Sequence, residues 1–89
     1  MNDTDEQIAV TADDVWPADA ETDEGVVVNW FVRQGGTVEA GETLCEVQVE
    51  KVSFDVYAPA DGTLEEIVLD EDDEFERTAV IAYIEPSAE

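Results

Sequence analysis

Apolar and polar residues alternate in short runs along this chain, and Gly, Pro and acidic residues separate the runs. Val, Ile, Thr and aromatic residues dominate the runs, which is the composition of half-buried β-strands. No stretch keeps a 3.6-residue apolar period long enough to indicate a helix. The pattern therefore predicts an all-β protein. The expected strands are 8–10, 26–32, a brief return at Val38, 43–49, 52–57, 63–69 and 79–84, with a long polar loop at 11–25 and an acidic turn at 70–74.

The second half of the chain weakly repeats the first when the sequence is shifted by 37 residues. Each half holds about four short strands with one apolar face. Two such sheets facing each other in a small sandwich or flattened barrel would bury both faces. The matched positions are Glu24-Gly25 with Asp61-Gly62, Trp30 with Ile67, Val32 with Leu69, Val38 with Phe75, Glu39 with Glu76, Leu44 with Ile81, and Val47 with Ile84.

Segments 43–49 and 52–57 are interpreted as the two strands of a hairpin. Their alternating apolar faces can bury together, and this fixes the register. Glu50 and Lys51 are then the two turn residues, although neither is favoured in a tight turn. The repeat places the equivalent point of the second half near Pro86, so we expect the tip at the opposite end of the domain from the termini. The apolar positions are Cys45, Val47 and Val49 on one strand and Val52, Phe54 and Val56 on the other.

Lys51 is the only lysine in a chain of 89 residues that has 25 acidic residues against three basic ones. A solvated lysine at a turn is ordinary in most proteins, but here it is the one that an acidic composition retains. A Schiff-base or general-base lysine needs burial to depress its pKa, and a two-residue turn offers no such pocket. An amine held out on a rigid tip suits covalent attachment by a ligase instead.

The net charge of −22 limits the partners that the protein can have. It argues against nucleic acid and against anionic membranes, because both need basic residues. We interpret it as the surface of a folded protein adapted to a salt-rich cytoplasm, where carboxylate repulsion is screened. The N-terminus lacks the features of a signal peptide and no apolar run approaches a membrane span. We therefore expect a cytoplasmic protein.

The inventory of reactive side chains is small. The chain has no histidine, which excludes a His-based metal site or a Ser-His-Asp triad. Its single cysteine, Cys45, cannot form an internal disulfide and is interpreted as a small core residue. No nucleophile–base pair or metal cluster is visible, so we expect no catalytic residues and no bound metal.

Three motifs follow one another along the chain: GGTVEAGETL at 35–44, VQVEKV at 47–52 and APADG at 58–62. In this order and spacing they resemble a lipoyl domain of the biotinyl/lipoyl carrier family. The family tip reads roughly Glu-Thr-Asp-Lys-Ala, preceded by Gly-Asp-x-Val-x-x-Gly-x-x-Leu and followed by Ala-Pro-x-x-Gly. Gly25 and Trp30 also fall at positions that resemble the family pattern. The resemblance covers residues 6–85, with 1–5 as an acidic N-terminal tail and 86–89 as a C-terminal tail.

This resemblance implies a flattened barrel-sandwich of two four-stranded antiparallel sheets with pseudo-twofold symmetry. Lys51 would carry lipoate as an amide, and the resulting swinging arm would move acyl groups and reducing equivalents within a 2-oxo acid dehydrogenase-type complex. The implied partners are a lipoate-protein ligase or lipoyl transferase, a thiamin-dependent 2-oxo acid decarboxylase, an acyltransferase and dihydrolipoamide dehydrogenase. The domain would be a monomeric, non-catalytic carrier, because the cofactor supplies the chemistry. The Met1 start and the lack of a Pro/Ala linker favour a free-standing carrier over an excised domain.

The chain departs from the family tip at four positions. Gln48 stands for Glu, Val49 for Thr, Glu50 for Asp and Val52 for Ala. Gly36 also replaces the usual Asp of the first turn. A biotin carrier on the same fold is an alternative, although biotin domains usually flank the lysine with methionines. A glycine-cleavage carrier would be longer, and an unmodified acidic interaction module is the alternative from another class.

Two further expectations concern the tryptophans. Trp30 and Phe31 are adjacent, so one should face the core while the other is at least partly exposed. Trp16-Pro17, in the loop 11–25, is expected to cap the barrel. By the family resemblance, this loop would lie near Lys51 and help partner enzymes to recognise the domain.

Overall fold

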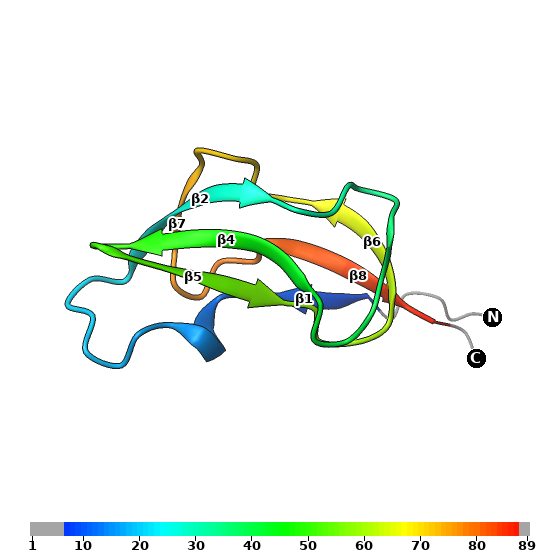
Figure 1. Cartoon of the computed structure of the whole chain (residues 1–89), viewed down its shortest axis with the longest axis horizontal. Coiled ribbons are helices and arrows are strands. Elements are labelled where there is room, and N and C mark those ends of the chain that lie inside the picture. Colours follow the sequence, from blue (N-terminus) through cyan, green and yellow to red (C-terminus); the bar gives the residue numbers. More distant parts are fainter. Residues whose placement is uncertain (1–6, 88–89) are drawn as a thin grey trace.

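Two antiparallel sheets of four strands each make up the fold (Figure 1). The computed structural model describes residues 7–87. One sheet has the order β1-β8-β6-β3 and the other β5-β4-β2-β7. The elements are β1 (Ile8–Val10), the 3-10 turn η1 (Asp13–Val15), β2 (Glu24–Trp30), β3 (Thr37–Val38), β4 (Thr43–Val49), β5 (Val52–Tyr57), β6 (Gly62–Ile67), β7 (Glu74–Glu76) and β8 (Ala82–Pro86).

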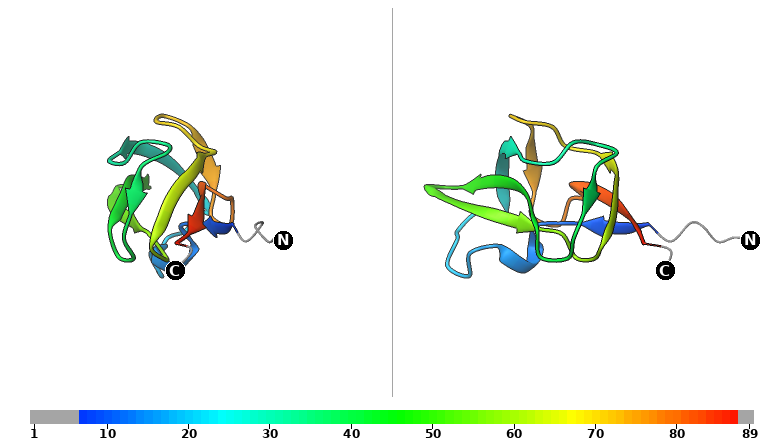
Figure 2. Two further views of the ribbon diagram at one scale, coloured as in Figure 1. Left: turned by 90° about the vertical axis from the view of Figure 1, so that its right-hand side faces the viewer. Right: turned by 45° about the vertical axis from the view of Figure 1, so that its right-hand side comes forward.

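The sheets face each other across one apolar core (Figure 2). The predicted all-β sandwich is confirmed, and the barrel is not closed, because β1 and β5 are edge strands of different sheets. No polar or charged side chain is buried among residues 7–87. The acidic residues are thus confined to the surface, where they keep their hydration. The largest fully buried side chains are Leu44, Leu64, Ile81, Ile84, Val27, Val38, Val47, Val49, Val56 and Cys45.

The 37-residue repeat is present in the backbone, hydrogen bond by hydrogen bond. Phe31 N–H donates to Leu44 O at 2.9 Å, and Val68 N–H donates to Ile81 O at the same distance. β-Bulges interrupt β2 between Val27 and Asn29 and β6 between Leu64 and Glu66. The turn residues Gly35 and Asp72 are also equivalent, and both have positive φ, 93° and 74°. The chain therefore folds as two equivalent halves related by a pseudo-twofold, as the repeat predicts.

The hairpin formed by β4 and β5 has the predicted bounds and register. Val49 pairs with Val52, and Val47 pairs with Phe54, which leaves Glu50 and Lys51 as the turn. Figure 1 shows the tip of this hairpin at one end of the molecule and the last strand, β8, running towards the other end. The prediction that tip and termini lie at opposite ends holds for the part of the chain that is described.

Four strands differ from the prediction. The acidic turn ends in a strand, β7, that pairs with β2 and buries only Phe75. A three-residue strand gives almost no alternation to detect. β2 and β6 begin two residues and one residue earlier than predicted, and both end two residues earlier, where the chain crosses to the other sheet. β8 runs from Ala82 to Pro86 rather than over 79–84, and Ala79 instead donates its backbone N–H to Glu76 O in a turn.

Candidate functional site

Lys51 is solvent-exposed at the tip of the β4–β5 hairpin, in the two-residue turn that the sequence predicts. Of the two turn residues, Glu50 has a positive φ of 58°. The left-handed region costs a non-glycine residue about 1–2 kcal/mol, so the surroundings must hold this turn in place. Gln48 contributes to this, because its Nε2 donates to the Glu50 carbonyl at 3.3 Å.

The apolar core reaches almost to the tip of the hairpin. Val49 and Val56 are each only 1% exposed, and Phe54 is partly buried against the core. Val52, however, is 50% exposed. The prediction that all three apolar residues of this strand bury together is wrong for Val52, because it lies on the edge strand β5, whereas its partner Val49 lies on the inner strand β4. Lys51 follows the last buried residue of β4 by two positions and is solvent-exposed.

Trp16 closes the core at the hairpin end of the domain. Its side chain is 6% exposed, and its ring makes edge-to-face contacts with Phe54 and Phe75, at centroid distances of 6.3 and 6.0 Å. The indole N–H donates to Thr22 O at 3.1 Å, which satisfies its polar atom. The expected capping role of Trp16 is confirmed. For the other pair, Trp30 packs against the core and Phe31 is 56% exposed, as expected.

The loop that carries Trp16 lies beside the lysine tip. Glu21 N–H donates to Glu50 Oε2 at 2.8 Å, across 29 positions of sequence. Arg77 holds both ends of the loop. Its side-chain Nε pairs with Asp13 Oδ1 at 2.6 Å, and its backbone N–H donates to Asp23 O at 2.7 Å. The predicted proximity of the loop to Lys51 is confirmed, whereas its role in partner recognition stays a prediction. Sequence reasoning did not find Glu21 or Arg77, since no local pattern marks a contact made across the fold.

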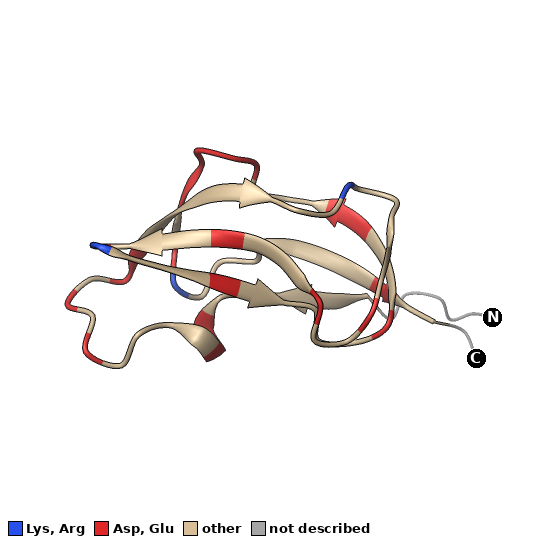
Figure 3. Ribbon diagram, in the orientation of Figure 1, with Lys and Arg blue, Asp and Glu red and all other residues tan. Residues whose placement is uncertain are grey.

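Acidic residues lie on the loop beside the basic tip and on the neighbouring strands (Figure 3). A shallow hollow beside the tip is lined by Glu24, Glu50 and Glu74, with Gly25, Val26 and Gln48 between them.

Two titratable groups away from the tip have raised pKa values. On the other sheet, a hydrogen bond with Glu85 and the charge of that residue raise the pKa of Glu65. Burial, and to a lesser extent the charge of Asp55, raises the pKa of Cys45 to about 12. The thiol is therefore protonated at neutral pH, which fits the predicted role as a core residue.

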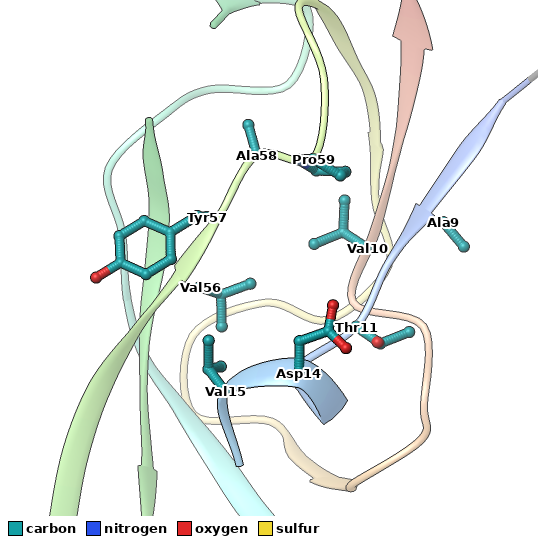
Figure 4. Close-up of a pocket in the computed structure, with 9 residues that line it drawn as sticks. All are labelled: Ala9, Val10, Thr11, Asp14, Val15, Val56, Tyr57, Ala58 and Pro59. Atoms are coloured by element: carbon teal, nitrogen blue, oxygen red, sulfur yellow. The ribbon is translucent and has the colours of Figure 1, made fainter. Parts of the chain in front are cut away.

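A second hollow lies along the open seam between the two sheets, where β1 and η1 face β5 (Figure 4). Its volume of about 240 Å³ is below the ~300 Å³ at which small-molecule sites begin. In Figure 4, the Tyr57 ring points away from the other lining side chains. The lining residues are Ala9, Val10, Thr11, Asp14, Val15, Val56, Tyr57, Ala58 and Pro59.

Two properties of the described chain bear on other functions. Within residues 7–87, no group of three or more Cys, Asp or Glu side chains is arranged to hold a metal ion. In the same range, no helix is long and apolar enough to cross a membrane. Lys51, the attachment site that the family resemblance implies, is solvent-exposed.

Comparison with known proteins identifies the family of the chain. A family model described as "Biotin-requiring enzyme" matches residues 16–84. The dihydrolipoyllysine-residue acetyltransferase component of the pyruvate dehydrogenase complex of Corynebacterium glutamicum is 44% identical over 61 residues, which are 68% of this chain and 9% of that protein. The same component from Staphylococcus epidermidis is 42% identical over 48 residues, 54% of this chain and 11% of that protein. The chain thus spans about a tenth of these relatives.

A solved structure has the same architecture. The lipoyl domain of the 2-oxoglutarate dehydrogenase complex from Azotobacter vinelandii superposes with a TM-score of 0.67 and 26% identity, over 91% of this chain and 98% of that domain. The family match covers most of the chain, and the fold agrees with it across both sheets. The chain belongs to the biotinyl/lipoyl family and is a lipoyl domain of that family.

Proposed function

We propose that Lys51 carries lipoate and that the domain shuttles acyl groups and reducing equivalents between the enzymes of a 2-oxo acid dehydrogenase-type complex. The observation that carries this proposal is the position of the sole lysine: it is exposed in a two-residue turn at the far end of a hairpin. Relatives from pyruvate dehydrogenase complexes and a structural neighbour from a 2-oxoglutarate dehydrogenase complex support the assignment.

An exposed lysine on a hairpin tip suits a covalently attached group that projects into solvent, rather than a ligand enclosed in a pocket. The lipoate carboxyl carbon would form an amide with Lys51 Nζ, and Lys51 is exposed to solvent. Loss of the lysine charge would change the net charge from −22 to −23. Bound lipoate supplies a dithiolane that accepts an acyl group together with two electrons. The protein holds the attachment point rigidly, and the tether raises the local concentration of the group at each partner.

Four partner enzymes would act on the domain. A lipoate-protein ligase or lipoyl transferase would load Lys51. A thiamin-dependent 2-oxo acid decarboxylase, an acyltransferase and dihydrolipoamide dehydrogenase would use the loaded arm in turn. We also propose that the domain is a cytoplasmic, non-catalytic monomer.

Intact mass tests the attachment directly. The protein purified from its native host should carry a lipoyl-sized increment, and the Lys51→Arg variant should lack it. Because the chain has one lysine, digestion and peptide mapping should place the increment on the peptide that contains it. A biotin-sized increment would change the proposed chemistry to carboxyl transfer.

A reconstituted reaction provides the control. The unmodified domain is incubated with lipoate, ATP and a lipoate-protein ligase in 2 M KCl, beside the Lys51→Arg variant. Modification of the wild type alone is expected. No adduct under these conditions, or from the native host, would contradict the carrier role and favour an acidic interaction module.

A further inference from the structure

Glu50, the residue before the lysine, contacts a segment far from it in sequence. Its Oε2 accepts the hydrogen bond from Glu21 N–H at 2.8 Å. Its own carbonyl accepts from Gln48 Nε2 at 3.3 Å. Both ends of Glu50 are thus held by neighbours within the domain, so this acid is engaged even when no other protein is bound.

The hairpin tip depends on such contacts because little else supports it. The two facing side chains at the ends of the strands, Val49 and Val52, differ sharply: one is buried and the other is half exposed. Beyond them lie only two residues, and Glu50 has the unfavourable positive φ of 58°. A two-residue turn of this kind needs an outside contact to keep one orientation.

The loop that donates the hydrogen bond is itself firmly held. Trp16 anchors it in the core through Phe54 and Phe75, and the indole N–H donates to Thr22 O, one residue after Glu21. The next residue, Asp23, is also held, because the backbone N–H of Arg77 donates to its carbonyl oxygen. The Glu21 amide therefore stands at a defined place relative to the core.

We propose that Glu50 is a positioning residue whose carboxylate fastens the Lys51 tip to the loop and so fixes the direction in which the amine and its attached group leave the domain. This inference rests on the proposed attachment at Lys51. The glutamate is one methylene longer than the aspartate of the family tip, which extends its reach towards the loop. A free tip would spend only a fraction of its time in the orientation that a ligase accepts, and the apparent rate constant would be reduced to that fraction of its value.

Amide exchange measures the contact without any partner enzyme. Hydrogen exchange of the Glu21 amide is followed by NMR in wild type, Glu50→Ala, Glu50→Gln and Glu74→Gln. A hydrogen bond of ordinary net strength corresponds to about fivefold protection, so Glu50→Ala should raise the exchange rate about fivefold. Glu50→Gln keeps an acceptor oxygen and should retain most of the protection. Glu74→Gln is the matched control, because it removes one charge from the same hollow and should change nothing.

Lipoylation of the same four proteins measures the consequence. With lipoate, ATP and a lipoate-protein ligase in 2 M KCl, Glu50→Ala should lower kcat/KM about fivefold, and Glu50→Gln should restore most of it. Unchanged Glu21 exchange in Glu50→Ala would overturn the proposal. So would a Glu50→Gln variant that protects the amide yet is modified as poorly as Glu50→Ala, since the ligase would then read the charge itself. Failure of the wild type to be modified would instead refute the attachment at Lys51, and the exchange data would separate these cases.

Discussion

Replacing Trp16 by alanine should destabilise the domain severely. The side chain is 6% exposed and contacts two other aromatic rings, Phe54 and Phe75. Truncation of a buried Trp costs about 3–5 kcal/mol. This cost includes the loss of the indole hydrogen bond to Thr22 O. At 0.05–0.15 kcal/mol per residue, a domain of this size has roughly 4–13 kcal/mol of stability in total. The substitution should therefore remove about a quarter of it or more.

Urea unfolding in 2 M KCl, followed by far-UV circular dichroism, measures this loss. Trp16→Phe is the matched variant, because it keeps a ring against Phe54 and Phe75 but removes the indole donor. It should lose about 1–2 kcal/mol. A loss below about 1 kcal/mol for Trp16→Ala would refute the reasoning that this side chain closes the core. If reductive acylation of the lipoylated variant were also unchanged, the loop would have no role in partner recognition.

Three further predictions follow from packing, burial and charge. Gly62→Ala should lower the free energy of unfolding by about 3 kcal/mol, because the added Cβ would overlap the Glu85 backbone. Gly41→Ala has open space around its Cβ and should lower it by about 1 kcal/mol, because of the φ of +87°. Equal melting temperatures for the two variants would contradict this. Because burial raises the pKa of Cys45 to about 12, the thiol of the unfolded chain ionises at lower pH than that of the folded chain. The free energy of unfolding should therefore fall between pH 9 and pH 11, and Cys45→Ala should flatten this decline in urea titrations. Identical pH profiles for the two proteins would contradict the prediction. The melting temperature should rise from 0.1 to 1 M KCl, as the Debye length falls from about 10 to about 3 Å; a flat or falling profile would contradict salt adaptation.

The hairpin that carries the lysine was predictable because its information is local. Alternating apolar residues on both strands fix the register, since a slip of one residue would turn every side chain to the other face. Glu50 and Lys51 are then the two residues left to form the turn. The repeat of 37 residues added the long-range element, because equivalent halves must bury equivalent faces.

Other features had weak local signals. The strand β7 buries one residue, Phe75, so no alternation marks it, although the repeat matched that residue to Val38. The exposure of Val52 depends on the position of β5 at the edge of its sheet, which the pattern of its own strand does not encode.

The sequence by itself determined the all-β class, the two-sheet arrangement, the position of Lys51 and the lipoyl-domain resemblance, because each depends on side-chain period, on residue identity or on motif spacing. Only the tertiary structure decided what surrounds the lysine. The hydrogen bond from Glu21 to Glu50 and the ion pair of Arg77 with Asp13 join residues 29 and 64 positions apart. Such contacts involve exposed polar side chains with no hydrophobic period, so they exist only once the packed core has brought their backbones together.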